Sequence, residues 1–354
     1  MVLRVNGPMA SKAIWEGGSW ELFGQDDESG HKGIAWLKKN IPYTPPGSTQ
    51  SPNSLQTLDI WIPRVDASPD ESKVPTESGV HSNGLPWIVY IHGGAWRDPE
   101  ITSTSFTSTV QSLLSTQSTR ARIGGLVSLN YSLSPYPNHP SNPSPPNNPS
   151  EEPDSSRLVH HPQHIIDVIT ALIFLQRAGA LTHSYTLVGH SAGATLAFQS
   201  IMRGAEWFQR EEYLSSLLPP RCILGVNGLY DLPTLIDDPG PKHRPLIPIY
   251  DEILVGAFCA DPRQKASCVK VLTSASPALG AAVQHCREFI LAQSLEDTLV
   301  PYSQTETMLR HLGSLKETDP KVVVRQVDIS GDHDDLWQQG HRLAEILRDV
   351  LDLQ

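Results

Sequence analysis

The chain has 354 residues, of which 39% are hydrophobic and 18% are charged, and its formal net charge is -11 at pH 7. An acidic surface does not attract nucleic acid or an anionic membrane, so we expect neither as a partner and expect a small-molecule substrate. The length is sufficient for two domains, but single α/β catalytic domains commonly exceed about 250 residues, and we predict one domain over residues 1–354.

The amino-terminal residues indicate the cellular compartment of the protein, and the cysteines indicate its redox environment. Residues 1–10 contain no basic segment followed by a sustained apolar run, and no stretch approaches the ~18 apolar residues of a membrane span, so we predict a cytoplasmic protein. The cysteines are few and form no C-x-x-C pattern, which predicts reduced thiols, no zinc site and no cofactor; they are Cys222, Cys259, Cys268 and Cys286.

Strands alternate with helices along the chain, which is typical of a doubly wound, mostly parallel sheet with helices on both faces. Apolar and polar residues alternate over residues 58–62, which predicts a half-exposed edge strand. The apolar run Trp87–Ile91 predicts a buried strand that leads directly into His92-Gly93-Gly94-Ala95-Trp96. Glycines at such a strand end can turn their N–H groups toward a substrate, so Gly93 and Gly94 are candidate oxyanion-hole donors.

Residues 134–156 interrupt this pattern. They are rich in proline, serine and asparagine, and they lack the apolar side chains that would offset the entropy of ordering the segment. We therefore predict an inserted surface loop there, and we expect its residues 135–153 to be mobile and dispensable for activity.

The pentapeptide Gly189-His190-Ser191-Ala192-Gly193 lies between an apolar run at 185–188 and a helix-forming stretch at 194–202. A G-x-S-x-G sequence in this strand–turn–helix context is typical of a nucleophile elbow, whose glycines let strand and helix pass closely. Ser191 is therefore the candidate nucleophile. The N–H group of Ala192, the next residue, is the third candidate oxyanion-hole donor.

Two later strand ends supply the partners of the serine. Asp297 follows the apolar run 289–292, and His333 follows the predicted strand 322–327. The chain order Ser, Asp, His is that of the α/β-hydrolase fold, which we predict here. Glu296 is an alternative acid, although the D-x-x-V-P spacing favours Asp297 at the loop tip.

Two further segments complete the predicted domain. Residues 231–277 contain helical patches without a clear strand, which predicts a small cap over the edge of the sheet. Apolar residues recur with helical spacing over 343–351, which predicts a terminal helix packed on the sheet.

These motifs resemble those of the kynurenine formamidases, α/β-hydrolases that deformylate N-formylkynurenine in tryptophan breakdown. That family carries H-G-G-x-W where related esterases usually have H-G-G-G, and here Trp96 is the discriminating residue. The resemblance continues through Trp96-Arg-Asp-Pro-Glu100, Gly189-His-Ser-Ala-Gly-Ala194, Gly228-Leu-Tyr-Asp-Leu232, Asp297 with Val300-Pro301, and His333. It covers nearly the whole catalytic domain, is similar to the fungal type, and departs from the family at the proline-rich loop.

The resemblance implies a serine hydrolase of N-formyl-L-kynurenine in the kynurenine pathway, which serves de novo NAD biosynthesis. Trp96 would wall the acyl site or stack on the aromatic ring of the substrate, and a core position that supports the glycine loop is equally open. The other candidate pocket residues, each with a core or cap alternative, are Trp207, Tyr250, Phe258 and Trp337. A short-chain carboxylesterase and a non-catalytic binding protein of the same fold remain alternatives, and the oligomeric state, including a homodimer, stays open.

Overall fold

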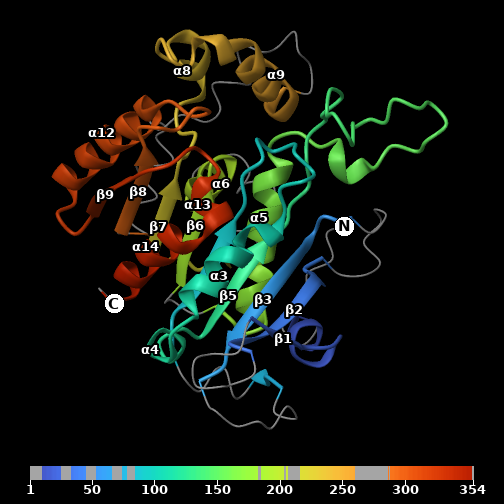
Figure 1. Cartoon of the computed structure of the whole chain (residues 1–354), viewed down its shortest axis with the longest axis vertical. Coiled ribbons are helices and arrows are strands. Elements are labelled where there is room, and N and C mark those ends of the chain that lie inside the picture. Colours follow the sequence, from blue (N-terminus) through green and yellow to red (C-terminus); the bar gives the residue numbers. More distant parts are fainter. Residues whose placement is uncertain are drawn as a thin grey trace.

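Within the part of the chain that the structure describes, a nine-stranded sheet forms the centre of the molecule (Figure 1). The computed structural model describes residues 10–24, 33–44, 53–65, 74–77, 84–181, 185–202, 205, 216–259, 286 and 288–352. The strand order is β1-β2-β3-β5-β4-β6-β7-β8-β9. The strands are β1 Glu21–Phe23, β2 Ala35–Pro42, β3 Thr57–Pro63, β4 Trp87–Ile91, β5 Gly125–Leu129, β6 Tyr185–His190, β7 Cys222–Val226, β8 Glu288–Ser294 and β9 Val323–Ile329.

The sheet is mostly parallel, as the sequence predicted. β1, β2 and β3 pair antiparallel in turn, and β3 pairs antiparallel with β5. All strands from β5 across to β9 run parallel. The carboxyl ends of these parallel strands therefore meet at one edge, which is where ligands bind in open α/β sheets.

Helices cover both faces of the sheet. One face carries α3 and α14, and the other carries α5, α6 and α12 (Figure 1). The helices are η1 Lys12–Glu16, η2 Ser103–Phe106, α3 Thr107–Leu113, α4 Gln117–Arg120, η3 Ser155–Arg157, α5 Gln163–Arg177, α6 Ala192–Gln199, α8 Leu232–Asp237, η5 Arg244–Leu246, α9 Ile247–Phe258, α12 Tyr302–Thr318, α13 Asp335–Gln339 and α14 His341–Asp352.

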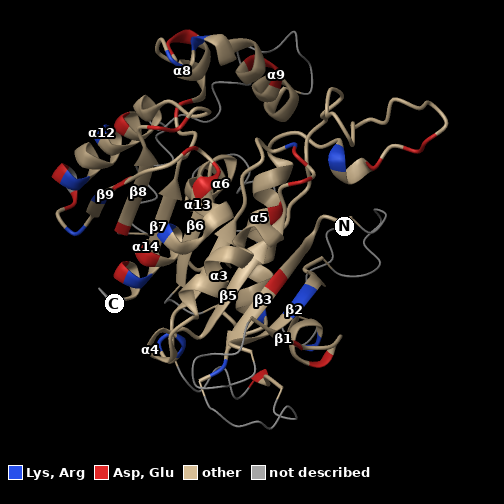
Figure 2. Ribbon diagram, in the orientation of Figure 1, with Lys and Arg blue, Asp and Glu red and all other residues tan. Residues whose placement is uncertain are grey.

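The central strands are apolar throughout because both of their faces are buried. Along β4, Val89 and Ile91 belong to one core cluster, whereas Ile88 and Tyr90 belong to the cluster on the opposite face. Successive side chains of a strand point to opposite faces, so a strand covered on both sides has no solvent-facing position for a polar residue. Figure 2 shows the same property as an absence of Lys, Arg, Asp and Glu from β4, β6 and β7.

The prediction of a half-exposed edge strand at residues 58–62 is wrong. β3 lies between β2 and β5, and all five of these residues are buried. Asp59 is accommodated because its Oδ1 accepts a hydrogen bond from the Asn40 N–H at 2.8 Å and its Oδ2 accepts one from the Ser103 hydroxyl at 2.8 Å. Burial raises the pKa of this carboxyl above its usual range.

The proline-rich loop at 134–156 follows β5 and is tied to its own base. Tyr136 and Ser144 form an isolated antiparallel bridge. The guanidinium of Arg157 donates to the side chain and the carbonyl of Asn142, each at 2.6 Å. These contacts give the base of the loop a defined conformation that its composition did not indicate.

Helices α8 and α9 form the described part of the predicted cap and lie beyond the carboxyl ends of the strands (Figure 1). Residues 260–277 of that cap lie outside the described residues. No helix among the described residues is long and apolar enough to cross a membrane.

The cysteines correct one prediction. Cys222 and Cys286 are buried thiols that take part in no disulfide bond, as expected for structural cysteines. Cys259, which follows α9, is disulfide-bonded, so the prediction of a reduced thiol is wrong at this position. Sequence spacing alone did not show this bond, since disulfide pairing depends on which loops the fold brings together. Cys268 lies outside the described residues.

Candidate active site

Ser191 occupies a sharp turn between β6 and α6. Its backbone has φ 53° and ψ -122°, a strained conformation for a residue with a side chain. A Cβ atom on Gly189 would lie 2.3 Å from the carbonyl oxygen of Gly193, and one on Gly193 would lie 2.1 Å from that of Ile91. Both glycines of the pentapeptide are therefore required for strand and helix to pass, as the sequence predicted.

Asp297 and His333 form a buried pair at the same edge of the sheet. His333 Nδ1 donates to Asp297 Oδ2 at 2.8 Å, and the side chain of Asp297 has no exposed surface. The other carboxylate oxygen accepts the N–H groups of Leu299 and Val300, each at 2.8 Å. Both oxygens of the buried carboxylate therefore have hydrogen-bond donors, which hold Asp297 in place against the imidazole.

The alternative acid is placed differently. Glu296 is exposed and accepts the N–H group of Gly331 at 2.6 Å. Its carboxylate bonds to the loop that carries His333, whereas the imidazole itself bonds to Asp297. The imidazole is therefore paired with Asp297 and not with Glu296.

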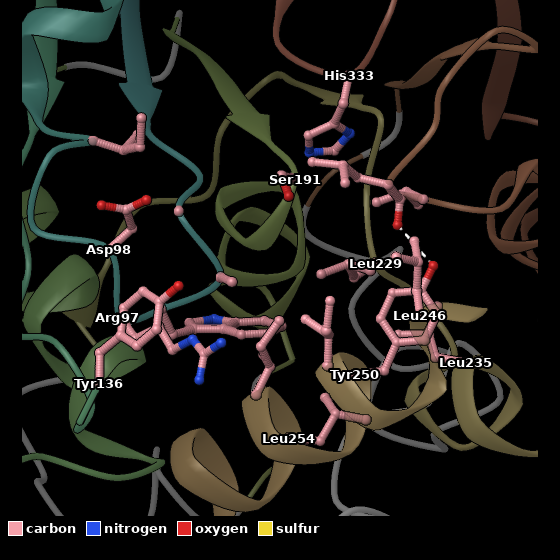
Figure 3. Close-up of a pocket in the computed structure, with 18 of the residues that line it drawn as sticks. Arg97, Asp98, Tyr136, Ser191, Leu229, Leu235, Leu246, Tyr250, Leu254 and His333 are labelled. Atoms are coloured by element: carbon pink, nitrogen blue, oxygen red, sulfur yellow. Dashed lines mark hydrogen bonds between the residues drawn. The ribbon is translucent and has the colours of Figure 1, made fainter. Parts of the chain in front are cut away.

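Ser191 and His333 lie next to each other in the wall of one cavity (Figure 3). No hydrogen bond joins the hydroxyl to the imidazole in the part of the chain that the structure describes. Nucleophile–base contacts of this kind often become short only when substrate is bound. In a neutral His333 the ring proton is on Nδ1, which donates the hydrogen bond to Asp297. Nε2 is then the nitrogen that can accept a proton.

Two residues that the sequence did not indicate hold the backbone of His333. Its carbonyl oxygen accepts from His190 Nε2 at 2.9 Å and from Asn227 Nδ2 at 3.1 Å. Burial, with the neighbouring His333 as a smaller cause, lowers the pKa of His190 to about 4, so this imidazole is neutral and can donate only through Nε2. The signal available in the sequence was position: His190 precedes the nucleophile and Asn227 directly follows β7.

The loop after β4 has an unusual backbone. Gly94, Ala95 and Trp96 have φ values of 85°, 50° and 60°, which places three successive residues in the left-handed region. For residues other than glycine this costs on the order of 1–3 kcal/mol each. The turn closes because the carbonyl of Gly94 accepts the N–H groups of Arg97 and Asp98 at 2.9 and 2.8 Å.

Tyr131 buttresses this strained loop. Its hydroxyl donates to the carbonyl oxygens of His92 and Gly93, at 3.0 and 2.9 Å, and its ring stacks on the imidazole of His92 with centroids 4.4 Å apart. A Cβ on Gly93 would lie 2.9 Å from His190 Nδ1 and 3.0 Å from the Cβ of Ser191. Glycine at this position lets the loop approach the nucleophile.

The cavity beside Ser191 has a volume of about 230 Å³ and two unlike sides (Figure 3). Arg97, Asp98 and Tyr136 lie on one side, and Leu229, Leu235, Leu246 and Tyr250 lie on the other. Gly94, Ala95 and Trp96 also line it. Of the predicted oxyanion donors, Gly94 therefore borders the cavity directly, together with Ala95, which the sequence did not indicate.

The predicted aromatic residues fall into different places. Trp96 is 1% exposed, lines the cavity and packs edge-on against Phe258 of α9 with ring centroids 4.9 Å apart. Tyr250 lines the cavity, whereas Trp337 donates to Asp334. Trp207 lies outside the described residues. Trp96 thus combines the two alternatives that the sequence left open, since it is both a cavity wall and a core residue.

Potential metal ligands meet once among the described residues. His190, His333 and Asp334 have ligand atoms within 4.8 Å of one another. His190 Nε2 bonds to a carbonyl oxygen, and His333 Nδ1 bonds to Asp297. The two imidazoles are therefore arranged to position a base beside a serine, and this donor set fits a metal poorly.

Comparisons with known proteins find fungal relatives of this chain. A kynurenine formamidase-like hydrolase from Fusarium equiseti is 34% identical over 310 residues, which cover 86% of this chain and 91% of that protein. A kynurenine formamidase from Aspergillus versicolor is 33% identical over 267 residues, covering 72% and 84%. No protein-family profile matches the chain.

Solved structures share the fold at low sequence identity. Esterase B from Lactobacillus rhamnosis aligns with a TM-score of 0.56 at 16% identity, covering 93% of this chain and 89% of that one. Carboxyl esterase 2 from the fungus Tuber melanosporum aligns with a TM-score of 0.55 at 15% identity, covering 99% and 98%. At such identities these structures establish the fold alone.

The fold and the relatives together define a serine hydrolase of the α/β-hydrolase class. Within that class, the chain belongs to the family of fungal kynurenine formamidase-like hydrolases.

Proposed function

We propose that the chain hydrolyses N-formyl-L-kynurenine to L-kynurenine and formate, a step of tryptophan degradation through the kynurenine pathway. The observation that carries the proposal is the buried Asp297–His333 pair beside Ser191, found in a chain of the kynurenine formamidase-like family. The named activity of the Aspergillus versicolor relative supports the choice of substrate.

In the proposed acylation step, Ser191 Oγ attacks the formyl carbon while His333 Nε2 takes the hydroxyl proton. Asp297 holds the imidazole in the required tautomer and stabilises the imidazolium that forms. The imidazolium then protonates the arylamine nitrogen as the C–N bond breaks. L-Kynurenine leaves, and a formyl ester remains on Ser191.

Backbone N–H groups would stabilise the tetrahedral intermediate. The N–H groups of Gly94, Ala95 and Ala192 donate to no acceptor among the described residues, and the first two border the cavity with Ser191. We assign these three as the oxyanion donors, with Gly93 serving close packing against Ser191. Loss of one such donor typically costs about 3–4 kcal/mol of transition-state stabilisation.

The second half of the reaction repeats these roles with water. His333 takes a proton from water, whose oxygen attacks the formyl ester, and returns the proton to Ser191 Oγ as formate leaves. A formyl group is the smallest acyl group, so the cavity volume serves mainly the aromatic leaving group. Trp96 provides an aromatic wall for it.

A carboxylesterase of short-chain esters is the second candidate, favoured by the apolar side of the cavity. Leu229, Leu235 and Leu246 lie on that side beside Tyr250, and such side chains would also hold an acyl chain. The deciding measurement is kcat/KM of the purified chain on N-formyl-L-kynurenine and on p-nitrophenyl acetate and butyrate, with Ser191→Ala as the control. We expect the formamide to be preferred. Preference for the butyrate would contradict the proposal, and turnover of none would favour a binding protein.

A further inference from the structure

Arg97 is a buried cation, and most of its N–H donors have no acceptor among the described residues. Its side chain is 6% exposed, and a single contact from Nη1 to Glu252 Oε1, at 2.8 Å, is its one side-chain hydrogen bond in the described part of the chain. An arginine carries five N–H donors in a planar fork. Nε and Nη2 have no acceptor among the described residues, and neither belongs to the buried unpaired atoms, so both remain accessible to a ligand.

Glu252 compensates Arg97 incompletely. The side chain of Glu252 is 40% exposed on α9, so water screens much of this ion pair. The ring of Tyr136 covers one face of the guanidinium at 3.9 Å and fixes its plane (Figure 3). A guanidinium with a fixed plane and free donors is arranged to bind a planar anion through two hydrogen bonds.

Asp98 gives the same side of the cavity a free acceptor. Its Oδ1 accepts the Glu100 N–H at 2.9 Å and lies 3.5 Å from His139 Nε2, whereas Oδ2 has no partner among the described residues. Asp98 and Arg97 both line the cavity that holds Ser191. One side of the cavity therefore presents both a cation with free donors and an anion with a free acceptor.

We propose that this side binds the zwitterionic α-amino acid group of the substrate, with Arg97 holding the carboxylate and Asp98 holding the ammonium. The inference rests on the proposed function and deepens it, since it distinguishes an amino-acid formamide from a plain aryl formamide. The apolar side of the cavity is left to the aromatic ring, and Ser191 lies between the two.

Matched substrates separate these contacts. The first pair is N-formyl-L-kynurenine and N-formylkynurenamine, which lacks the carboxylate, and a third substrate is the desamino analogue, which lacks the ammonium. The variants are Arg97→Gln and Asp98→Asn. The control is Arg342→Gln, which removes an exposed arginine that also pairs with a glutamate, Glu345. For each protein the readout is the ratio of kcat/KM between two substrates.

We expect the wild type to prefer N-formyl-L-kynurenine over N-formylkynurenamine by about 10- to 100-fold, the range for hydrogen bonds between charged groups. Arg97→Gln should abolish this preference, mainly through KM, and Asp98→Asn should abolish the preference over the desamino analogue. Arg342→Gln should keep both. If Arg97 has only a structural role, Arg97→Gln should instead lower kcat/KM equally on all three substrates. Glu252→Gln should then lower kcat/KM by as much as Arg97→Gln. That result would overturn the inference and leave the proposed function standing.

A binding measurement keeps the two proposals separable. In a Ser191→Ala background, calorimetry with L-kynurenine and kynurenamine reports on the carboxylate contact without any turnover. We expect the acid to bind more tightly, and Arg97→Gln in that background to remove the difference. Equal affinities before the substitution would overturn the inference, whereas failure of the wild type to hydrolyse any of the three formamides would contradict the proposed function.

Discussion

At the scale of single residues, we expect the candidate triad to act as a unit. Ser191→Ala and His333→Ala should each fold normally and lower kcat on N-formyl-L-kynurenine by about 10⁴-fold or more, because the first change removes the nucleophile and the second removes the base that would take its proton. Asp297→Asn should lose somewhat less, since it mainly disturbs the tautomer of His333.

Steady-state kinetics with circular dichroism as the folding check would measure these losses. Glu296→Gln is the matched control, because it neutralises the adjacent exposed carboxylate, and it should stay within a few-fold of the wild type. Retained turnover in Ser191→Ala would end the hydrolase assignment of this serine. A larger loss in Glu296→Gln than in Asp297→Asn would show that the acid is the other residue.

Trp96 is expected to act on specificity. It lines the cavity and also packs on Phe258, so Trp96→Ala removes both a wall and a core contact. We expect kcat/KM on N-formyl-L-kynurenine to fall at least about tenfold more than on p-nitrophenyl acetate, which needs little positioning. Equal losses on both substrates, with a lower melting temperature, would mean that Trp96 only supports the strained loop.

The sequence indicated the members of the candidate triad more readily than the residues that contact them. Ser191, Asp297 and His333 stand at strand ends in a fixed order, and local pattern was sufficient to select them. His190 and Asn227 escaped notice because their role is a contact to a backbone carbonyl 106 or more positions away in the chain. Such a contact leaves no periodicity or spacing in the sequence.

At the scale of elements, the proline-rich loop shows how composition can mislead. Its base carries Tyr136, which stacks on Arg97 and lines the cavity. The expectation that the loop is dispensable therefore applies only to its outer part. Replacing residues 145–153 by a short glycine–serine linker should leave kcat/KM within a few-fold, because those residues lie outside the cavity wall.

Replacement of the longer segment 135–153 should behave differently. It removes Tyr136, so we expect KM for N-formyl-L-kynurenine to rise well beyond the effect of the shorter replacement while the melting temperature stays similar. Kinetics and thermal unfolding of the two variants side by side would test this. Identical kinetics would show that Tyr136 contributes nothing to substrate binding.

Of two strands predicted from the sequence, the environment of residues 87–91 was predicted correctly and that of residues 58–62 was not. Trp87–Ile91 was predicted correctly because a run without polar residues has only one environment, a sheet buried on both faces. Residues 58–62 alternate in polarity, and the alternation was read as solvent on one side. Asp59 is instead hydrogen-bonded inside the protein, and Trp61 packs edge-on against Phe106. Alternation in the sequence shows which residues are polar. Whether a polar residue faces solvent or is hydrogen-bonded inside the protein depends on the fold.

At the scale of the whole molecule, buried neutral histidines should make the fold sensitive to acid. Burial lowers the pKa of His92 and His190 to about 4 and that of His164 to about 3. An unfolded histidine has a pKa of about 6.5, so between these values the unfolded chain binds protons that the folded protein does not. The free energy of unfolding therefore decreases as the pH is lowered. The decrease is on the order of 1–2 kcal/mol per histidine between pH 7 and pH 5.

Urea unfolding at those two pH values would test this for one site. His164→Gln keeps a group able to bond the Ser134 hydroxyl but cannot titrate, so its unfolding free energy should drop less between the two pH values than that of the wild type. The exposed His341 supplies the control, since His341→Gln should leave the drop unchanged. An equal drop in all three proteins would contradict the assignment of His164 as a neutral buried group.

The sheet order has a consequence for how activity arises. Ser191, Asn227, Asp297 and His333 follow β6, β7, β8 and β9, which are successive neighbours in the sheet. The nucleophile and the glycine loop belong to strands in the middle of the sheet, whereas the base follows the outermost strand and the last one in chain order. During biosynthesis Ser191 emerges long before His333, so we expect the nascent chain to have no hydrolytic activity until β9 docks on β8. Hydrolysis of a chromogenic ester can thus report, in a refolding or translation reaction, when the final strand joins the sheet.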